Sequence, residues 1–82
     1  MKVLLVGVGG VGEAIAVISK SRPWLEKLVL SDYNLDRVRE VHHKLGSPAH
    51  MPVEFVDAGD RGQVVALIKK HQADLLINAV DP

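Results

Sequence analysis

The chain has 82 residues, no cysteine, and ten acidic side chains against ten basic ones, so its formal net charge is zero. This length makes one small domain, residues 1–82, which buries only about 60 % of the surface that the unfolded chain exposes. Hydrophobic residues make up 48 %, which excludes a disordered polymer. The balanced charge excludes the basic footprint of most nucleic-acid-binding proteins. The absence of cysteine excludes disulfides and thiolate metal sites and favours a cytoplasmic location, and no apolar run is long enough for a membrane span.

The first half of the chain predicts two strands and two helices. The aliphatic run Val3–Val6 predicts a strand buried on both faces. The run Leu28–Leu30 is the second strand. Between them, apolar residues at helical spacing predict a helix with one apolar face: Val11, Ala14, Ile15 and Ile18. A second helix follows over 35–45, with Asn34 as its amino-terminal cap and Gly46 just past its carboxyl end.

The second half predicts two more strands and a third helix. Val53–Phe55 is short and only partly alternating, which indicates an edge strand. Asp60 and Gln63 have the spacing of a capping box, and helical spacing continues to His71. Leu75–Ile77 is the fourth strand.

The alternation of strands and helices predicts an α/β fold, a three-layer open parallel sheet with helices on both faces. We expect four strands in the order 3-2-1-4, with three helices, because this order makes the third strand an edge. The sequence stops after the fourth strand, so we expect the first half of a larger sheet. That would leave the edge of the fourth strand unpaired, and we expect self-association through it.

Four of the seven glycines lie between the first strand and the first helix, in the sequence Gly7-Val8-Gly9-Gly10-Val11-Gly12. In such a motif the first glycine permits a tight turn, the second lets the backbone approach a pyrophosphate, and the third lets the helix pack on the sheet. We assign these roles to Gly7, Gly9 and Gly12. The amides of Gly10 and Val11 begin the helix, where free N–H groups favour an anion.

Twenty residues after Gly12, Asp32 ends the second strand. A carboxylate at this place accepts hydrogen bonds from the adenosine ribose hydroxyls and repels a 2′-phosphate, so the expected cofactor is NAD rather than NADP. Tyr33 follows it, where Arg or Ser would suit a 2′-phosphate. Arg37 lies one turn into the next helix and is placed to swing toward such a phosphate. The alternative is purely structural: the glycines make only a turn, and Asp32 only ends a strand.

Four segments resemble the amino-terminal cofactor domain of the saccharopine dehydrogenase family, a Rossmann-like fold: Lys2–Gly12, Ser31–Leu35, Phe55–Asp60 and Leu76–Pro82. The resemblance implies an NAD- or NADP-dependent oxidoreductase acting on amine or imine bonds. It also implies that Asp57 and Ala58 border the adenine, and that the backbone at Ala79 and Val80 runs along the adenosine and pyrophosphate. The family's catalytic residues lie in a later domain, so we assign none here and expect the 82 residues alone to be inactive.

Two other functions use the same features. A regulatory NAD sensor, like the cytoplasmic modules of potassium channels, has this glycine loop and acid without hydride transfer. A structural or interaction domain with a vestigial loop is the third alternative. No residues have the spacing of a metal site; His42 and His43 are adjacent on a helix and point about 100° apart.

Overall fold

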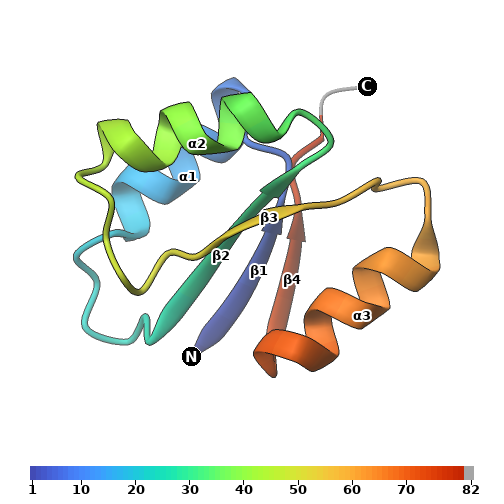
Figure 1. Ribbon diagram of the computed structural model, residues 1–82. Coiled ribbons are helices and arrows are strands. Elements are labelled where there is room, and N and C mark those ends of the chain that lie inside the picture. Colours follow the sequence, from blue (N-terminus) through green and yellow to red (C-terminus); the bar gives the residue numbers. More distant parts are fainter. Residues whose placement is uncertain (81–82) are drawn as a thin grey trace.

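The computed structural model describes residues 1–80 as a parallel sheet with helices on both faces (Figure 1). The elements, in chain order, are β1 (Lys2–Val6), α1 (Gly10–Ser19), β2 (Lys27–Asp32), α2 (Leu35–Lys44), β3 (Val53–Phe55), α3 (Arg61–His71) and β4 (Leu75–Asn78). All three strand pairs are parallel, and the order is β3-β2-β1-β4. The predicted fold class and strand order are confirmed. Among these elements no helix is long and apolar enough to cross a membrane.

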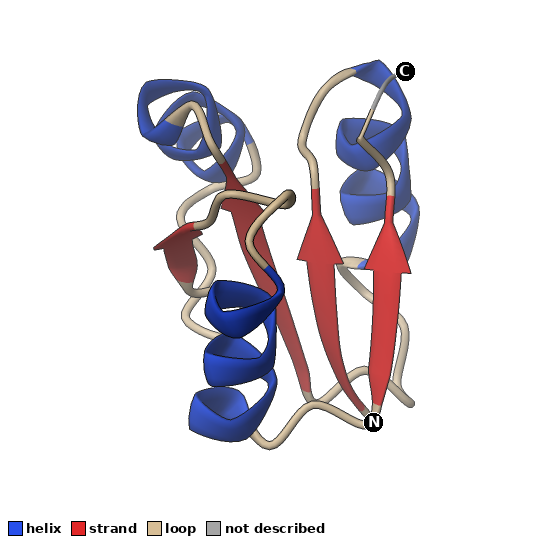
Figure 2. Ribbon diagram, turned by 90° about the vertical axis from the view of Figure 1, so that its right-hand side faces the viewer, coloured by secondary structure: helices blue, strands red, loops and turns tan. Residues whose placement is uncertain are grey.

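The core has two parts because β1 is central and alternate side chains point to opposite faces of the sheet. Val3 and Leu5 pack in the cluster with residues of α1 and α2, whereas Leu4 and Val6 pack in the cluster with residues of α3. All four are at most 2 % exposed. Figure 2 shows the helices on the two sides of the strands. The prediction of a strand buried on both faces is confirmed.

The helix ends follow the predicted capping residues, with one difference. The Asn34 side chain accepts a hydrogen bond from the Arg37 amide, and the Asp60 side chain accepts one from the Gln63 amide. A capping box would return the Gln63 side chain to the Asp60 amide. Instead, Gln63 Oε1 accepts from the amide of Asp57, 3.0 Å away. The Gln63 side chain therefore fixes the turn that leaves β3.

Helix α1 is present as predicted, but it does not bury its apolar stripe. Val11 and Ile18 are 57 % and 61 % exposed, and Ile15 is only partly buried. The buried residues of α1 are Gly12 and Ala16. Small residues allow the helix axis to lie close to the sheet, so they take the inner face and the larger side chains remain outside.

Candidate functional site

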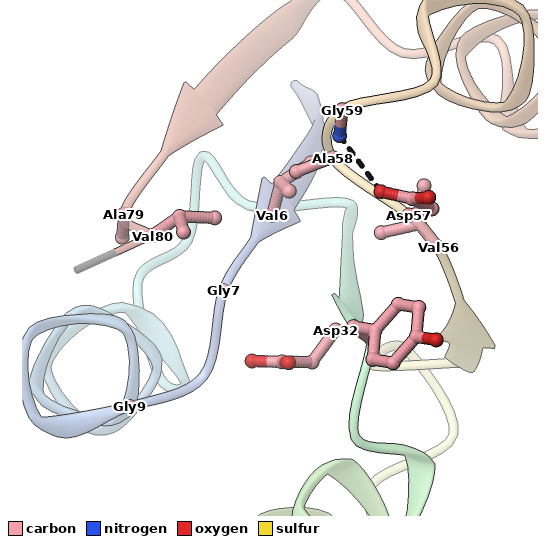
Figure 3. Close-up of a pocket in the computed structure, with 11 residues that line it drawn as sticks. Val6, Gly7, Gly9, Asp32, Val56, Asp57, Ala58, Gly59, Ala79 and Val80 are labelled. Atoms are coloured by element: carbon pink, nitrogen blue, oxygen red, sulfur yellow. Dashed lines mark hydrogen bonds between the residues drawn. The ribbon is translucent and has the colours of Figure 1, made fainter. Parts of the chain in front are cut away.

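A cavity of about 450 Å³ lies where all four strands end, at the carboxyl edge of the sheet. In open parallel sheets this edge is where ligands bind, at the point where the chain reverses strand order. Here that point lies between β1 and β4. In Figure 3 the Asp32 side chain points across the cavity toward the strand-to-helix loop, and Ala58 and Val80 lie on other walls.

The structure brings eight of the eleven predicted site residues together around this cavity. They are Gly7, Gly9, Asp32, Tyr33, Asp57, Ala58, Ala79 and Val80. The other three, Gly10, Val11 and Gly12, form the first turn of α1 beside it. The Val11 side chain is exposed, so any contribution from this residue to the cavity comes through its backbone.

Two glycines of the loop are required by its geometry. Gly7 has φ +98°, and a Cβ there would lie 2.8 Å from the backbone of Ala79 and Val80. A Cβ on Gly12 would lie 1.9 Å from the Gly7 carbonyl oxygen. The predicted turn at Gly7 and close helix packing at Gly12 are both present, and together they bring the beginning of α1 against the ends of β1 and β4.

The amino end of α1 is open to an anion. Its cap, Gly9, offers no side-chain hydrogen bond. The Glu13 amide donates to the Gly9 carbonyl at 2.8 Å, which is the first backbone hydrogen bond of the helix. The first amides of a helix have no partner within the helix and carry the positive end of its dipole. A Cβ on Gly10 would meet nothing within 4 Å, so the space beside the first residue of α1 is open. This donor set fits a pyrophosphate.

The Asp32 carboxylate lines the cavity and is also part of the scaffold. Its Oδ2 accepts from the Val8 amide at 2.8 Å, and its Oδ1 accepts from the Asn34 amide at 3.0 Å. A carboxylate has about four acceptor positions, so two remain for ribose hydroxyls. Asp32 therefore joins the glycine loop to the beginning of α2 while it faces the ligand space.

Short turns shape the opposite walls of the cavity. Asp57 Oδ1 accepts from the Gly59 amide at 2.9 Å (Figure 3). In the turn after β4, Asn78 Oδ1 accepts from the Val80 amide at 3.1 Å. These side-chain-to-backbone bonds two residues apart stabilise turns. They fix the backbone that follows the strands, while Ala58 stays open to the cavity.

Sequence reasoning missed three lining residues, Val6, Val56 and Gly59. Val6 and Val56 are buried residues that come directly before a loop. A hydrophobic residue at the end of a strand is expected in the core, so the sequence gives no sign that either residue also lines a ligand cavity. Gly59 had a usable signal, since a small residue two positions after Asp57 is typical of a side-chain-capped turn.

Arg37 occupies a position that the sequence did not predict. Its Nε donates to the Val8 carbonyl at 3.1 Å, Nη2 to Glu13 at 3.0 Å, and Nη1 to Glu40 at 3.0 Å. A swing of Arg37 toward a 2′-phosphate, which its place in the sequence allows, would break these contacts. In this structure the guanidinium is hydrogen-bonded to the glycine loop and to the two glutamates.

The most strongly perturbed carboxylate lies away from the cavity, on the face covered by α3. Burial raises the pKa of Glu54, but hydrogen bonds from Lys70 and His71 and their charges outweigh burial and hold the pKa below 4.5. The Glu54 Oε2 atom lies 2.7 Å from Lys70 Nζ and 2.6 Å from His71 Nε2. Within residues 1–80 no three His, Asp or Glu side chains gather as a metal site.

One known protein family has a sequence model that matches nearly the whole chain. The sequence model described as the saccharopine dehydrogenase NADP binding domain matches residues 3–82. The chain belongs to the saccharopine dehydrogenase family. The match favours a dinucleotide-binding domain of this family over the regulatory-module and vestigial-loop alternatives. A comparison with curated proteins finds no match.

Proposed function

We propose that the chain binds NAD, in preference to NADP, across the carboxyl edge of the sheet as the cofactor domain of an oxidoreductase. The supporting observation is the cavity itself, which combines the open amides of α1 with the Asp32 carboxylate. In this proposal the pyrophosphate lies against Gly9, Gly10 and Val11, and the adenosine ribose hydroxyls donate to Asp32. Asp57 borders the adenine.

Charge supports NAD over NADP. The cavity is lined by two carboxylates, Asp32 and Asp57, and by no lysine or arginine among residues 1–80. Arg37 is held by Glu13 and Glu40, and Arg61 lines a smaller adjoining cavity of about 220 Å³ on the α3 side. A 2′-phosphate would add negative charge beside Asp32, and no lysine or arginine among the residues that line this cavity is there to receive it. This proposal departs from the cofactor in the family's description.

We further propose that the chain serves an enzyme that acts on amine or imine substrates, because it belongs to the saccharopine dehydrogenase family. The bound nicotinamide supplies the hydride chemistry, and these residues bind and orient the cofactor. We assign no catalytic residue to this chain. A cytoplasmic location remains a prediction from the absence of cysteine.

Isothermal titration of the protein with NAD, NADH and NADP tests the proposed function. We expect binding of NAD, weaker binding of NADP, and a smaller NAD preference in Asp32→Ala. Thermal unfolding gives a second readout, because a ligand that binds only the folded state raises the melting temperature. Failure of all three nucleotides to bind at millimolar concentration would refute the proposal.

We also propose that two copies associate through the outer edge of β4. Within the described residues β4 pairs only with β1, and Leu75 and Leu76 are each 44 % exposed. A mostly apolar groove of about 190 Å³ adjoins it, lined by residues that include Ile15, Trp24 and Leu75. An unpaired apolar edge pairs readily with another strand, and a second copy offers the same edge about a twofold axis.

Sedimentation velocity at high micromolar concentration tests this association. We expect a dimer in the wild-type protein and a monomer in Leu76→Lys. The control is Val65→Lys, which places the same charge on α3 at a residue that is 37 % exposed. A monomeric wild-type protein would contradict the proposal.

A further inference from the structure

The glycine loop is closed into a ring of hydrogen bonds with the beginning of α2. The Val8 amide donates to Asp32, and the Asn34 amide donates to the same carboxylate. The Asn34 side chain accepts from the Arg37 amide, and Arg37 Nε returns to the Val8 carbonyl. Both polar groups of the Val8 peptide backbone are thus held by side chains from β2 and α2. Val8 itself is fully buried.

Two glutamates hold Arg37 in this ring. Glu13 lies in the first turn of α1, and Glu40 lies one turn beyond Arg37 on α2. The side chains of Arg37 and Glu13 are only 28 % and 27 % exposed, so their contact is partly shielded from water. Lys44 also approaches Glu13, at 3.5 Å. Arg37 and Lys44 therefore offset the negative charge of Glu13, which lies in the first turn of α1.

The position of Arg37 bears directly on the ribose. Its guanidinium donates to the Val8 carbonyl. The Val8 amide donates to Asp32, which lines the cavity. The Val8 peptide group thus links the guanidinium of Arg37 to the Asp32 carboxylate, which would receive the ribose hydroxyls. A guanidinium is well shaped to bind a phosphate through two parallel hydrogen bonds. In this structure the guanidinium donates to the Val8 carbonyl, Glu13 and Glu40 instead.

We propose that Arg37 is a positioning residue that holds the glycine loop, and that Glu13 and Glu40 set the cofactor preference by keeping it there. Removing these two carboxylates frees Arg37 to meet a 2′-phosphate without changing any residue that lines the cavity. The inference rests on the proposed function, because it concerns the same cavity and the same cofactors. It adds that Glu13 and Glu40, which do not line the cavity, determine the preference between NAD and NADP.

The decisive experiment measures the ratio of NAD to NADP affinity by isothermal titration. In Glu13→Gln/Glu40→Gln we expect this ratio to fall by about fivefold or more, mainly because NADP binds more tightly. The charge-matched control is Glu26→Gln/Asp36→Asn. Glu26 pairs with Lys2, and Asp36 lies in the first turn of α2, so this control removes two negative charges and leaves Arg37 in place.

A triple variant separates Arg37 from the general effect of charge. Adding Arg37→Ala to Glu13→Gln/Glu40→Gln should abolish the gain in NADP affinity. The inference is overturned if the triple variant keeps that gain, or if the double variant has the same ratio as its control. If the wild-type protein binds neither NAD nor NADP, the proposed function fails and this inference fails with it.

Discussion

Gly12→Ala tests the geometry on which the site depends, the close contact between α1 and the end of β1. An alanine Cβ at this position would lie 1.9 Å from the Gly7 carbonyl oxygen and 2.8 Å from its carbonyl carbon. Both atoms belong to the backbone, so no side chain can rotate away. Gly7 is itself confined by the neighbouring backbone of Ala79 and Val80. The helix must therefore move outward by more than 1 Å, on the order of the overlap of a carbon and an oxygen atom.

Overpacking of this kind costs about 3 kcal/mol, the upper end of the usual range, because the clash involves backbone on both sides. A domain of this size has a total stability of about 4–12 kcal/mol, so the loss is a large fraction of it. The melting temperature should fall by roughly 12–24 °C, since 1 kcal/mol corresponds to about 4–8 °C in a domain of 60–100 residues.

Gly10→Ala is the matched control, two positions earlier in the same helix. Its Cβ would meet nothing within 4 Å, and a glycine-to-alanine change at a compatible position stabilises by about 0.4–1 kcal/mol. Urea and thermal unfolding followed by far-ultraviolet circular dichroism measure both variants. A Gly12→Ala protein within about 0.5 kcal/mol of the wild type would refute the reasoning, because it would mean that α1 can move freely on the sheet.

Two further predictions concern cofactor binding and acid stability. Gly10→Ala should weaken NAD binding about tenfold while leaving the fold intact, because its methyl group enters the open space beside the first residue of α1, where the proposed pyrophosphate lies. Titration of the folded variant checks this, and unchanged affinity would place the pyrophosphate elsewhere. Glu54→Gln should cost about 1 kcal/mol at pH 7, where the carboxylate accepts from Lys70 and His71. The folded pKa of Glu54 is lowered from 4.5, so its contribution is present above pH 4.5 and is lost as the pH falls through the folded pKa. The stability difference between Glu54→Gln and the wild type should therefore shrink in acid, and a constant difference down to pH 3 would contradict this account.

The strand order and most of the site could be predicted because they depend on local sequence. Uninterrupted aliphatic runs identify buried parallel strands, and the weakly apolar Val53–Phe55 identifies the edge. The carboxyl ends of parallel strands meet at one edge of the sheet. Placing Asp32 and Asp57 after strands was therefore enough to predict that both lie at that edge, and the cavity brings them together.

The rest could not be predicted because it depends on contacts between distant segments. Helical periodicity counts apolar side chains, so it selected Val11 and Ile18 for the apolar face of α1; the inner face is decided by how closely Gly12 approaches Gly7. Arg37 reaches residues that are 29 and 24 positions away in the chain. No spacing rule reports such contacts.

The two functions of Asp32 determine how its mutation must be interpreted. The carboxylate holds the Val8 and Asn34 amides, and in the proposed function it also receives the ribose hydroxyls. Asp32→Ala would remove both contributions, so a loss of NAD affinity alone does not identify the ribose contact. The loop contribution acts through the pyrophosphate, which NAD and NADP share, and it should weaken both cofactors by the same factor. The ribose contribution favours NAD alone, because a 2′-phosphate replaces the hydroxyl and is repelled by the charge. The change in the NAD to NADP ratio therefore measures ribose recognition, whereas the common loss measures how far Asp32 holds the glycine loop in place.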